Sequence, residues 1–346
     1  MKKIRVLVVD DSAFARKVLR SILEAAPDIE VVGIARDGLD ALTKIQELKP
    51  DVVTLDLVMP NLDGLGTLRA LPALDPPRVV LVCMADATSD LALAALEAGA
   101  ADLVQKPTPH ASDRLYELGG DLLFKVRAAS HVSQATHAGT SAVGSALTPA
   151  AVKPRSYTGN YDLLVIGAST GGPQAVTRIL KALPADFPIP VGVVLHLPAG
   201  FTSSFAQRLS GECALPVTEG REGARLSRGH VAIAPGGLHM KLERDSRDFW
   251  LKVSREPASL HRPSVDQLFG SAAEAAPGRV LAVVLTGMGD DGLLGSRALH
   301  QGGSHVLVQN ESSCVVYGMP RAVKEAKFFT GEHDIEEMAS AILARV

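Results

Sequence analysis

The chain has 346 residues, of which 47% are hydrophobic and 21% charged, and its formal net charge is −3. At roughly 100–200 residues per domain this length suggests two domains, and the lack of a basic excess argues against a nucleic-acid or anionic membrane surface. Three widely spaced cysteines without a CxxC pair argue against a disulfide framework or a structural zinc site. No apolar run approaches the ~20 residues that span a bilayer, so we expect a cytoplasmic protein that binds no nucleic acid and does not insert into a membrane.

The first part of the chain alternates short β-branched apolar runs with longer amphipathic segments. Continuous apolar runs are typical of parallel strands buried on both faces, and the segments between them carry apolar residues at helical spacing. The predicted strands are Ile4–Val9, Val31–Ala35, Val52–Asp56, Val79–Cys83 and Asp102–Val104, and the predicted helices lie near Ala13–Ala26, Gly38–Leu48, Gly64–Leu71, Ser89–Ala98 and Ser112–Ala128. Five strand–helix units predict a flavodoxin-like, doubly wound α/β domain over residues 1–126.

The composition changes over Ser130–Asn160, where Ala, Ser, Thr, Gly and Pro replace almost all large apolar side chains. Such a segment cannot bury enough apolar surface to offset its ordering entropy, so it predicts a flexible interdomain linker, which we assign to residues 127–158. A loop of this length inside one compact domain would be rare.

The strand–helix alternation resumes at Tyr161 and predicts a second doubly wound, mostly parallel α/β domain over residues 159–346. The predicted strands are Leu163–Ile166, Val191–Leu195, His230–Ala234, Val280–Leu285 and His305–Val308, and the predicted helices lie near Pro173–Leu183, Phe201–Leu209, Val265–Ala275, Gly292–Gln301 and Ile335–Arg345. We interpret the polar segment Glu243–Asp248 as a turn in a smaller insertion.

Acidic residues follow two strands of the first domain. Asp10 and Asp11 end the first strand and Asp56 ends the third, and these strands are neighbours in a flavodoxin-like order. Taken singly, each aspartate could cap a helix or a loop. Together, three carboxylates at one edge call for a cation, and ligands that are all oxygen suit Mg²⁺. Lys106 follows the fifth strand and brings a positive charge that would help to stabilise a phosphoryl group on Asp56.

The first domain resembles the receiver domains of response regulators. The resemblance is carried by Val8-Val-Asp-Asp-Ser12, by Asp56 with Met59-Pro60 and Asp63-Gly64, and by Gln105-Lys106-Pro107. It implies that a histidine kinase phosphorylates Asp56, and that Asp11 and Asp56 hold Mg²⁺ with help from Asp10 and the Val58 carbonyl. It also implies that Lys106 contacts the phosphate, and that the Lys106–Pro107 peptide bond is cis.

Two positions depart from the receiver pattern. Receivers usually carry Ser or Thr at the end of the fourth strand, where this chain has Cys83-Met84, and often an aromatic residue at the position of Leu103. We therefore expect phosphorylation, but the sequence does not indicate how its effect is transmitted from the phosphorylation site to the rest of the protein.

In the second domain, a predicted strand runs into a serine flanked by glycines. The segment Gly167–Gly171 satisfies G-x-S-x-G, and Pro173 favours a helix start directly behind Ser169. This placement would expose the serine at the carboxyl edge of the strand, where main-chain N–H groups can face an oxyanion. A Gly-rich phosphate or dinucleotide loop is the competing interpretation, although neither G-x-G-x-x-G nor a Walker motif is present.

Two further elements end at the same predicted edge. His196 ends the next strand, and an acidic, Gly-rich turn containing Asp290 and Asp291 follows a third strand. An aspartate there could orient the imidazole of His196 as a base for Ser169, although each residue alone could be structural. The chain order Ser, His, Asp differs from that of α/β-hydrolases.

The second domain is similar to the chemotaxis protein-glutamate methylesterases, the CheB family. The similar segments are Gly167–Gly172, His196–Thr202, Ala234–His239, His261–Asp266, Leu285–Gly292 and Cys314–Pro320. The resemblance implies Ser169 as nucleophile, His196 as base, Asp291 as orienting acid and the Met288 N–H as oxyanion donor, with no cofactor in this site. We interpret His239, His261, Asp266 and His305 as structural supports, because their spacing predicts no metal site.

The same resemblance implies the substrate and the partners. The expected reactions are demethylation of glutamyl γ-methyl esters and deamidation of glutamines on methyl-accepting chemotaxis receptors, and the expected phosphodonor is a chemotaxis histidine kinase. We also expect the unphosphorylated receiver to pack over the Ser169 edge and inhibit it. The rival functions are a non-enzymatic regulator and a DNA-binding regulator. The sequence shows no basic recognition helix, which argues against the DNA-binding function.

Overall fold

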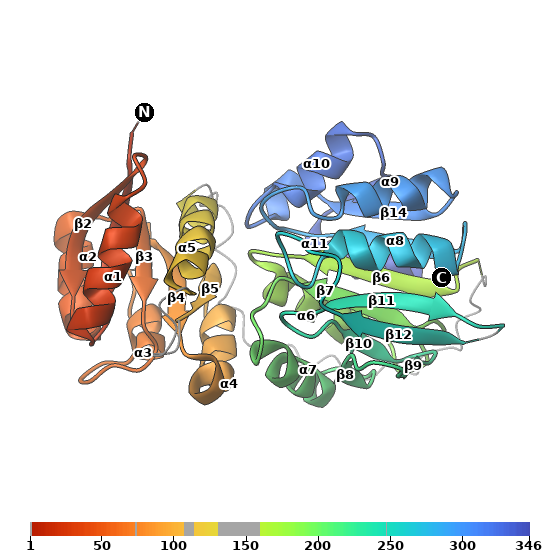
Figure 1. Cartoon of the computed structure of the whole chain (residues 1–346), viewed down its shortest axis with the longest axis horizontal. Helices are drawn as coiled ribbons and strands as arrows, with labels where there is room; N and C mark the ends of the chain where they lie inside the picture. Colours follow the sequence, from red (N-terminus) through yellow and green to blue (C-terminus); the bar gives the residue numbers. More distant parts are fainter. Residues whose placement is uncertain (1, 73–74, 107–113, 131–159, 247) are drawn as a thin grey trace.

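The computed structural model describes residues 2–72, 75–106, 114–130, 160–246 and 248–346. They form two α/β domains that lie side by side (Figure 1), here called the N-terminal domain and the C-terminal domain. None of the described helices combines the length and the apolar character needed to cross a membrane.

The N-terminal domain is built on a five-stranded parallel sheet in the order β2-β1-β3-β4-β5. Its strands are β1 (Ile4–Val9), β2 (Ile29–Ala35), β3 (Val52–Leu55), β4 (Arg78–Cys83) and β5 (Asp102–Gln105). Its helices are α1 (Ala13–Glu24), α2 (Gly38–Leu48), α3 (Gly64–Arg69), α4 (Ala85–Glu97) and α5 (Arg114–Ser130). This is the flavodoxin-like order, so the predicted fold is confirmed.

Local sequence accounts for these elements. Strands β3 and β4 are buried along their whole length, which explains why they are apolar except at Thr54 and Arg78. Helices α1, α2 and α3 begin at side-chain caps, where Ser12, Asp37 and Asp63 each accept a hydrogen bond from a first-turn backbone N–H.

Helix α5 ends at Ser130, four residues beyond the predicted boundary at 126. The remainder of the predicted linker, up to residue 158, lies outside the described residues, so the domain limits stay a prediction.

The C-terminal domain is built on a seven-stranded parallel sheet in the order β15-β14-β13-β6-β7-β10-β8. Its strands are β6 (Leu163–Ala168), β7 (Val191–Leu195), β8 (Val217–Glu219), β10 (Val231–Ile233), β13 (Val280–Val284), β14 (His305–Gln309) and β15 (Gly331–His333). Its helices are α6 (Gly172–Ala182), α7 (Phe201–Glu212), α8 (Val265–Ala275), α9 (Leu293–Gln301), α10 (Met319–Glu325) and α11 (Ile335–Leu343), with a 3₁₀ turn, η2, at Glu311–Ser313. The second predicted α/β architecture is therefore also confirmed.

A separate three-stranded antiparallel sheet accompanies this domain. It consists of β11 (His239–Arg244), β12 (Phe249–Ser254) and β9 (Arg225–Leu226). The turn predicted over Glu243–Asp248 is only partly confirmed, because Glu243 and Arg244 belong to β11 and pair with β12. The strands β11 and β12 themselves were not predicted from the sequence.

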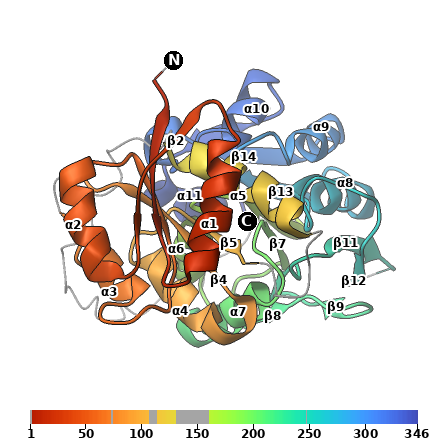
Figure 2. The same ribbon diagram turned by 60° about the vertical axis from the view of Figure 1, so that its left-hand side comes forward.

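The two domains meet through one face of the N-terminal domain. Helices α4 and α5 stand between its sheet and the C-terminal domain (Figure 1). Helix α4 packs against α6 and α7, and the view in Figure 2 shows these helices side by side.

Candidate active site and phosphorylation site

The turn after strand β6 carries Ser169. Strand β6 lies in the middle of the sheet, and Gly171 then caps helix α6 with a φ of +76°, in the left-handed region that favours glycine. A Cβ on Gly171 would also stand 2.6 Å from the Cβ of Val315. Glycine at this position therefore lets the chain turn sharply and leaves Ser169 at the carboxyl edge of the sheet.

The neighbouring strands bring His196 and Asp291 to the same edge. The Nε2 of His196 lies 2.8 Å from Oδ2 of Asp291, and both side chains are more than nine-tenths buried. The Asp291 carboxylate also accepts hydrogen bonds from Ser264 Oγ at 2.8 Å, Val265 N at 2.7 Å and Asp266 N at 2.9 Å. Burial alone would raise the pKa of Asp291, but His196 and the backbone N–H groups lower it to about 2.

These contacts define the tautomer of His196. An ionised carboxylate only accepts hydrogen bonds, so Nε2 carries the hydrogen and donates it to Asp291. The Nδ1 atom is buried and has no hydrogen-bond partner among the described residues. The arrangement therefore leaves Nδ1 as the atom of His196 that can take up a proton. Asp290, the alternative aspartate, is exposed at the start of the turn.

The turn after strand β13 is tied to the Ser169 loop. The Ser169 N–H donates to the Thr286 carbonyl at 3.0 Å, and the Thr286 hydroxyl donates to the Thr170 carbonyl at 2.9 Å. A Cβ on Gly287 would stand 2.7 Å from the Cβ of Ser169, so only glycine allows this approach. Met288 is the next residue, which places its main chain in the turn beside Ser169.

Two residues interpreted from the sequence as supports make close contacts here. The ring of His261 stacks on His196 with centroids 4.2 Å apart and planes 13° apart, and burial together with the charge of His196 lowers its pKa to about 4. Asp266 Oδ1 accepts hydrogen bonds from the N–H groups of Gly292 and Gly295, and burial raises its pKa to about 6. His239 lies apart from the stack: it is fully buried, and its Nε2 hydrogen-bonds the Pro257 carbonyl. The similarity of His261–Asp266 to the family had marked both residues as supports of the site. It did not predict the stacking of His261 or the hydrogen bonds of Asp266.

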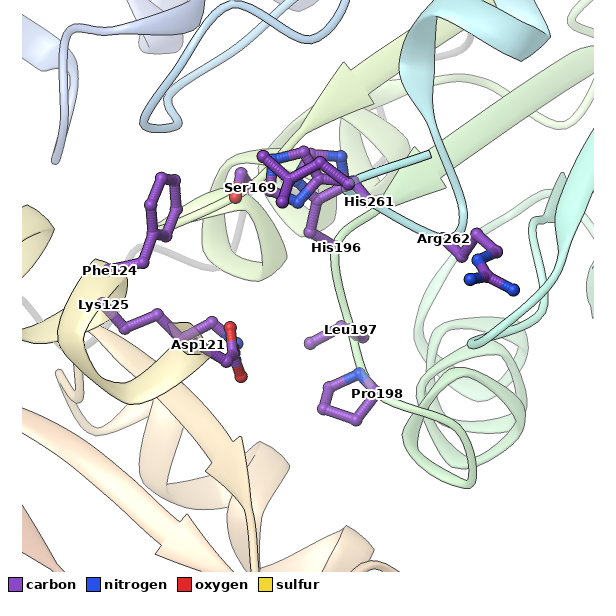
Figure 3. A pocket seen from close by; sticks show the side chains of 10 residues that line it. Asp121, Phe124, Lys125, Ser169, His196, Leu197, Pro198, His261 and Arg262 are labelled. Atoms are coloured by element: carbon purple, nitrogen blue, oxygen red, sulfur yellow. Dashed lines mark ion pairs between the residues drawn. The ribbon is translucent and has the colours of Figure 1, made fainter. Parts of the chain in front are cut away.

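A pocket of about 230 Å³ opens beside Ser169, and both domains line it (Figure 3). Its lining residues are Asp121, Phe124 and Lys125 from α5, and Ser169, His196, Leu197, Pro198, Leu260, His261 and Arg262 from the C-terminal domain. The predicted packing of the N-terminal domain over the Ser169 edge is thus present in the structure.

Hydrogen bonds join this edge to strand β5 and the loop before it. The Thr170 hydroxyl donates to Asp102 Oδ2 at 2.5 Å, and the Gly171 N–H donates to the Ala101 carbonyl at 3.2 Å. Gln174 Nε2 donates to the Ala100 carbonyl at 3.2 Å. The residues directly after Ser169 are therefore held by the N-terminal domain.

The acidic cluster of the N-terminal domain is formed as predicted. Asp10, Asp11 and Asp56 each offer a carboxylate oxygen within 4.8 Å of the others, and these ligands are all oxygen, as Mg²⁺ prefers. Lys106 Nζ lies 2.7 Å from Oδ2 of Asp10 and 2.7 Å from Oδ2 of Asp56. Burial raises the pKa of Asp56, and the charge of Lys106 opposes that rise. Val58 follows in the same loop and is 59% exposed.

The two departures from the receiver pattern lie in the core next to this cluster. Cys83 ends strand β4, is 1% exposed, and its carbonyl accepts a 2.8 Å hydrogen bond from the Lys106 N–H. Leu103 is fully buried, and its carbonyl accepts a 2.6 Å hydrogen bond from Lys125 Nζ. The Lys106–Pro107 peptide bond, predicted to be cis, lies outside the described residues.

Each of the two domains matches a known protein family. Residues 164–342 match the CheB methylesterase family, and residues 6–117 match the response regulator receiver domain. A protein-glutamate methylesterase/protein-glutamine glutaminase of Myxococcus xanthus is 53% identical over 99% of this chain and 98% of its own. One from Cupriavidus pinatubonensis is 43% identical over 99% of this chain and 96% of its own.

A solved structure is also similar to the C-terminal domain. The CheB methylesterase catalytic domain of Thermotoga maritima is 35% identical, with a TM-score of 0.53, over 54% of this chain and 99% of that domain.

Proposed function

Because the chain belongs to the CheB methylesterase family, we propose that it is a protein-glutamate methylesterase and protein-glutamine glutaminase whose activity its receiver domain controls. On this proposal it releases methanol from glutamyl γ-methyl esters, and ammonia from glutamines, on methyl-accepting chemotaxis receptors. One observation supports the site above all: the His196–Asp291 pair stands at the edge that carries Ser169, with His196 Nδ1 able to take up a proton.

The proposed mechanism uses Ser169 as nucleophile. As its Oγ adds to the γ-carbonyl carbon, its proton passes to His196 Nδ1, and ionised Asp291 stabilises the imidazolium. The Met288 N–H donates to the oxyanion that develops on the carbonyl oxygen. The proton on Nδ1 then goes to the leaving methoxide or amide nitrogen. Water releases the glutamate from Ser169 by the same steps, and the route needs no cofactor in this site.

The phosphorylation site is proposed to be Asp56, with a histidine kinase as phosphodonor. Asp10, Asp11 and Asp56 would hold Mg²⁺ together with the Val58 carbonyl, and Lys106 would contact the phosphate. When bound, Mg²⁺ supplies positive charge that offsets the carboxylates and the incoming phosphoryl group.

We further propose that the unphosphorylated receiver inhibits the esterase. The support is the position of helix α5, whose side chains line the pocket beside Ser169. An interface inside one chain is commonly modest in area, and tenfold activation needs only ~1.4 kcal/mol of differential stabilisation. A cytoplasmic location follows from the proposed kinase and receptor partners.

The test is methanol release from membranes that contain methylated receptors, with and without a small phosphodonor and Mg²⁺. The proposed function requires release that depends on Ser169 and increases with the phosphodonor. Equal release by the Ser169→Ala variant would refute it.

A further inference from the structure

One face of helix α5 covers the Ser169 edge. Asp121, Phe124, Lys125 and Ala128 follow the i, i+3, i+4, i+7 spacing of a single helix face. The first three line the pocket with Ser169 and His196, and Ala128 is fully buried in a small cluster with Val316, Val315 and Met288. The receiver therefore forms one wall of the pocket.

The ring of Phe124 is the largest group that this face brings to the pocket. Its centroid lies 5.8 Å from that of His261, with the planes tilted by 55°. Its tip, Cζ, lies 4.0 Å from where a Cβ on Gly289 would stand. Phe124 thus contacts the segment that stacks on His196 and approaches the turn that contains Met288, on the receiver side of Ser169 (Figure 3).

The volume of the pocket sets what can enter. One turn of an α-helix, about 10 Å wide and 5.4 Å high, occupies roughly 400 Å³. The pocket holds about 230 Å³, so a single side chain or a small ester can enter it while the receiver is in place, but a turn of helix cannot. Leu260, which is 88% exposed, lines the pocket, so the pocket opens to solvent beside it.

The receiver leaves the His196–Asp291 pair in place. The His196–Asp291 hydrogen bond is formed, and Asp291 keeps its three other donors. In the described part of the chain, His196 Nδ1 has no partner from either domain. The interdomain hydrogen bonds near Ser169 go to Thr170 and Gly171. The receiver therefore limits space at the site and does not occupy the proton-accepting atom.

Building on the proposed serine hydrolase, we infer that the unphosphorylated chain hydrolyses small acyl esters, and that Phe124 sets the size limit. With p-nitrophenyl acetate, Ser169 Oγ bonds to the acetyl carbon as the bond to p-nitrophenolate breaks, and the hydroxyl proton passes to His196 Nδ1. The proton on His196 then passes to solvent. Water adds to the acetyl carbon as the bond to Ser169 Oγ breaks; one water proton passes through His196 Nδ1 to Ser169 Oγ, and the other leaves with the acetate and is lost to solvent.

The experiment uses the full chain with p-nitrophenyl acetate and with methylated receptor membranes. Each is assayed with and without phosphoramidate and Mg²⁺, and the Ser169→Ala rate is subtracted. Hydrolysis of the small ester should change by less than about twofold on phosphorylation, while methanol release should rise about tenfold or more, a difference of ~1.4 kcal/mol.

The variant Phe124→Ala tests the size limit without phosphodonor. It should raise the rate with the bulkier p-nitrophenyl hexanoate several-fold. Phe14→Ala is the matched control, because Phe14 is 73% exposed on helix α1, and it should leave that rate unchanged. Equal rates for the two variants would overturn the role of Phe124.

The outcomes separate this inference from the proposed function. If only the phosphorylated chain cleaves p-nitrophenyl acetate through Ser169, the receiver disables the catalytic groups, and the inference is wrong while the esterase assignment stands. If neither form shows hydrolysis that depends on Ser169 on any substrate, the proposed function itself is wrong.

Discussion

The hydroxyl of Thr170 donates a 2.5 Å hydrogen bond to the carboxylate of Asp102, and this bond joins the residue after Ser169 to strand β5 of the receiver. The same strand leads into Lys106, whose Nζ lies 2.7 Å from Oδ2 of Asp56. Strand β5 therefore leads to the proposed phosphorylation site at one end and contacts the Ser169 loop at the other. Since Cys83 and Leu103 replace the usual switch residues, this strand offers a physical connection between the two sites.

We predict that Asp102→Ala raises methanol release by the unphosphorylated chain. The change removes the acceptor for Thr170, and a hydrogen bond of ~0.5–1.5 kcal/mol corresponds to roughly twofold to tenfold in the domain equilibrium. The rate of the phosphorylated chain should stay near that of the wild type. Asp40→Ala, on helix α2 away from the interface, is the control. A resting rate unchanged by Asp102→Ala would show that this bond does not hold the inhibited state.

Ser169→Ala should abolish the esterase activity, since loss of a triad nucleophile typically costs about 10⁶-fold in turnover. His196→Ala should be of similar severity. Circular dichroism should show that both variants stay folded. If Ser169→Ala kept even about a tenth of the wild-type rate, Ser169 could not be the nucleophile, because the expected loss is far larger.

Asp291→Asn should cripple the enzyme, although less than Ser169→Ala, because the amide disturbs the tautomer of His196. Asp290→Asn is the matched control, because Asp290 is exposed one residue earlier in the same turn. The two variants are compared by turnover on receptor membranes. The reverse pattern, with Asp290→Asn the damaging change, would contradict the assignment of the orienting acid.

Phosphorylation should occur at Asp56 and require Mg²⁺. Asp56→Ala should take up no phosphate from phosphoramidate, and Asp11→Ala should lose uptake because the metal site loses a ligand. Intact-mass spectrometry, followed by fragmentation, locates the modification. Phosphate on any other residue of the wild-type chain would disprove the assignment.

The buried carboxyl of Asp266 should make stability depend on pH. Burial raises its pKa from 3.8 to about 6, so the folded protein favours the neutral form. The neutral carboxyl of Asp266 therefore contributes its full share to the free energy of unfolding below pH 3.8, and this share is lost as the pH rises through about 6. In Asp266→Asn, the free energy of unfolding should fall less between these pH values than in the wild type. Urea unfolding over this range is the measurement, and parallel curves for the two proteins would contradict the prediction.

The two architectures were readable from the sequence because the central strands of both sheets are buried on both faces. Segments such as Leu163–Ile166 are continuously apolar for this reason, and their alternation with amphipathic helices predicts parallel sheets. The antiparallel strands β11 and β12 were missed. Strand β11 ends in the exposed residues Glu243 and Arg244, and β12 carries the exposed Lys252 within it, so both lack the unbroken apolar run of a buried strand. Strands β8, β9 and β15 are only two or three residues long, too short for a periodic pattern.

The sequence by itself also determined which residues reach the carboxyl edges, because a residue that ends a parallel strand has its position set by that strand. Ser169, His196 and Asp56 are of this kind. Only the tertiary structure decided that Asp291 rather than Asp290 meets His196, since adjacent residues of a turn point in different directions. It alone also decided that His261 stacks on His196 and that Phe124 reaches the pocket. Those contacts join segments far apart in the chain: the contacts of His196 need the folded C-terminal domain, and that of Phe124 needs both domains packed together.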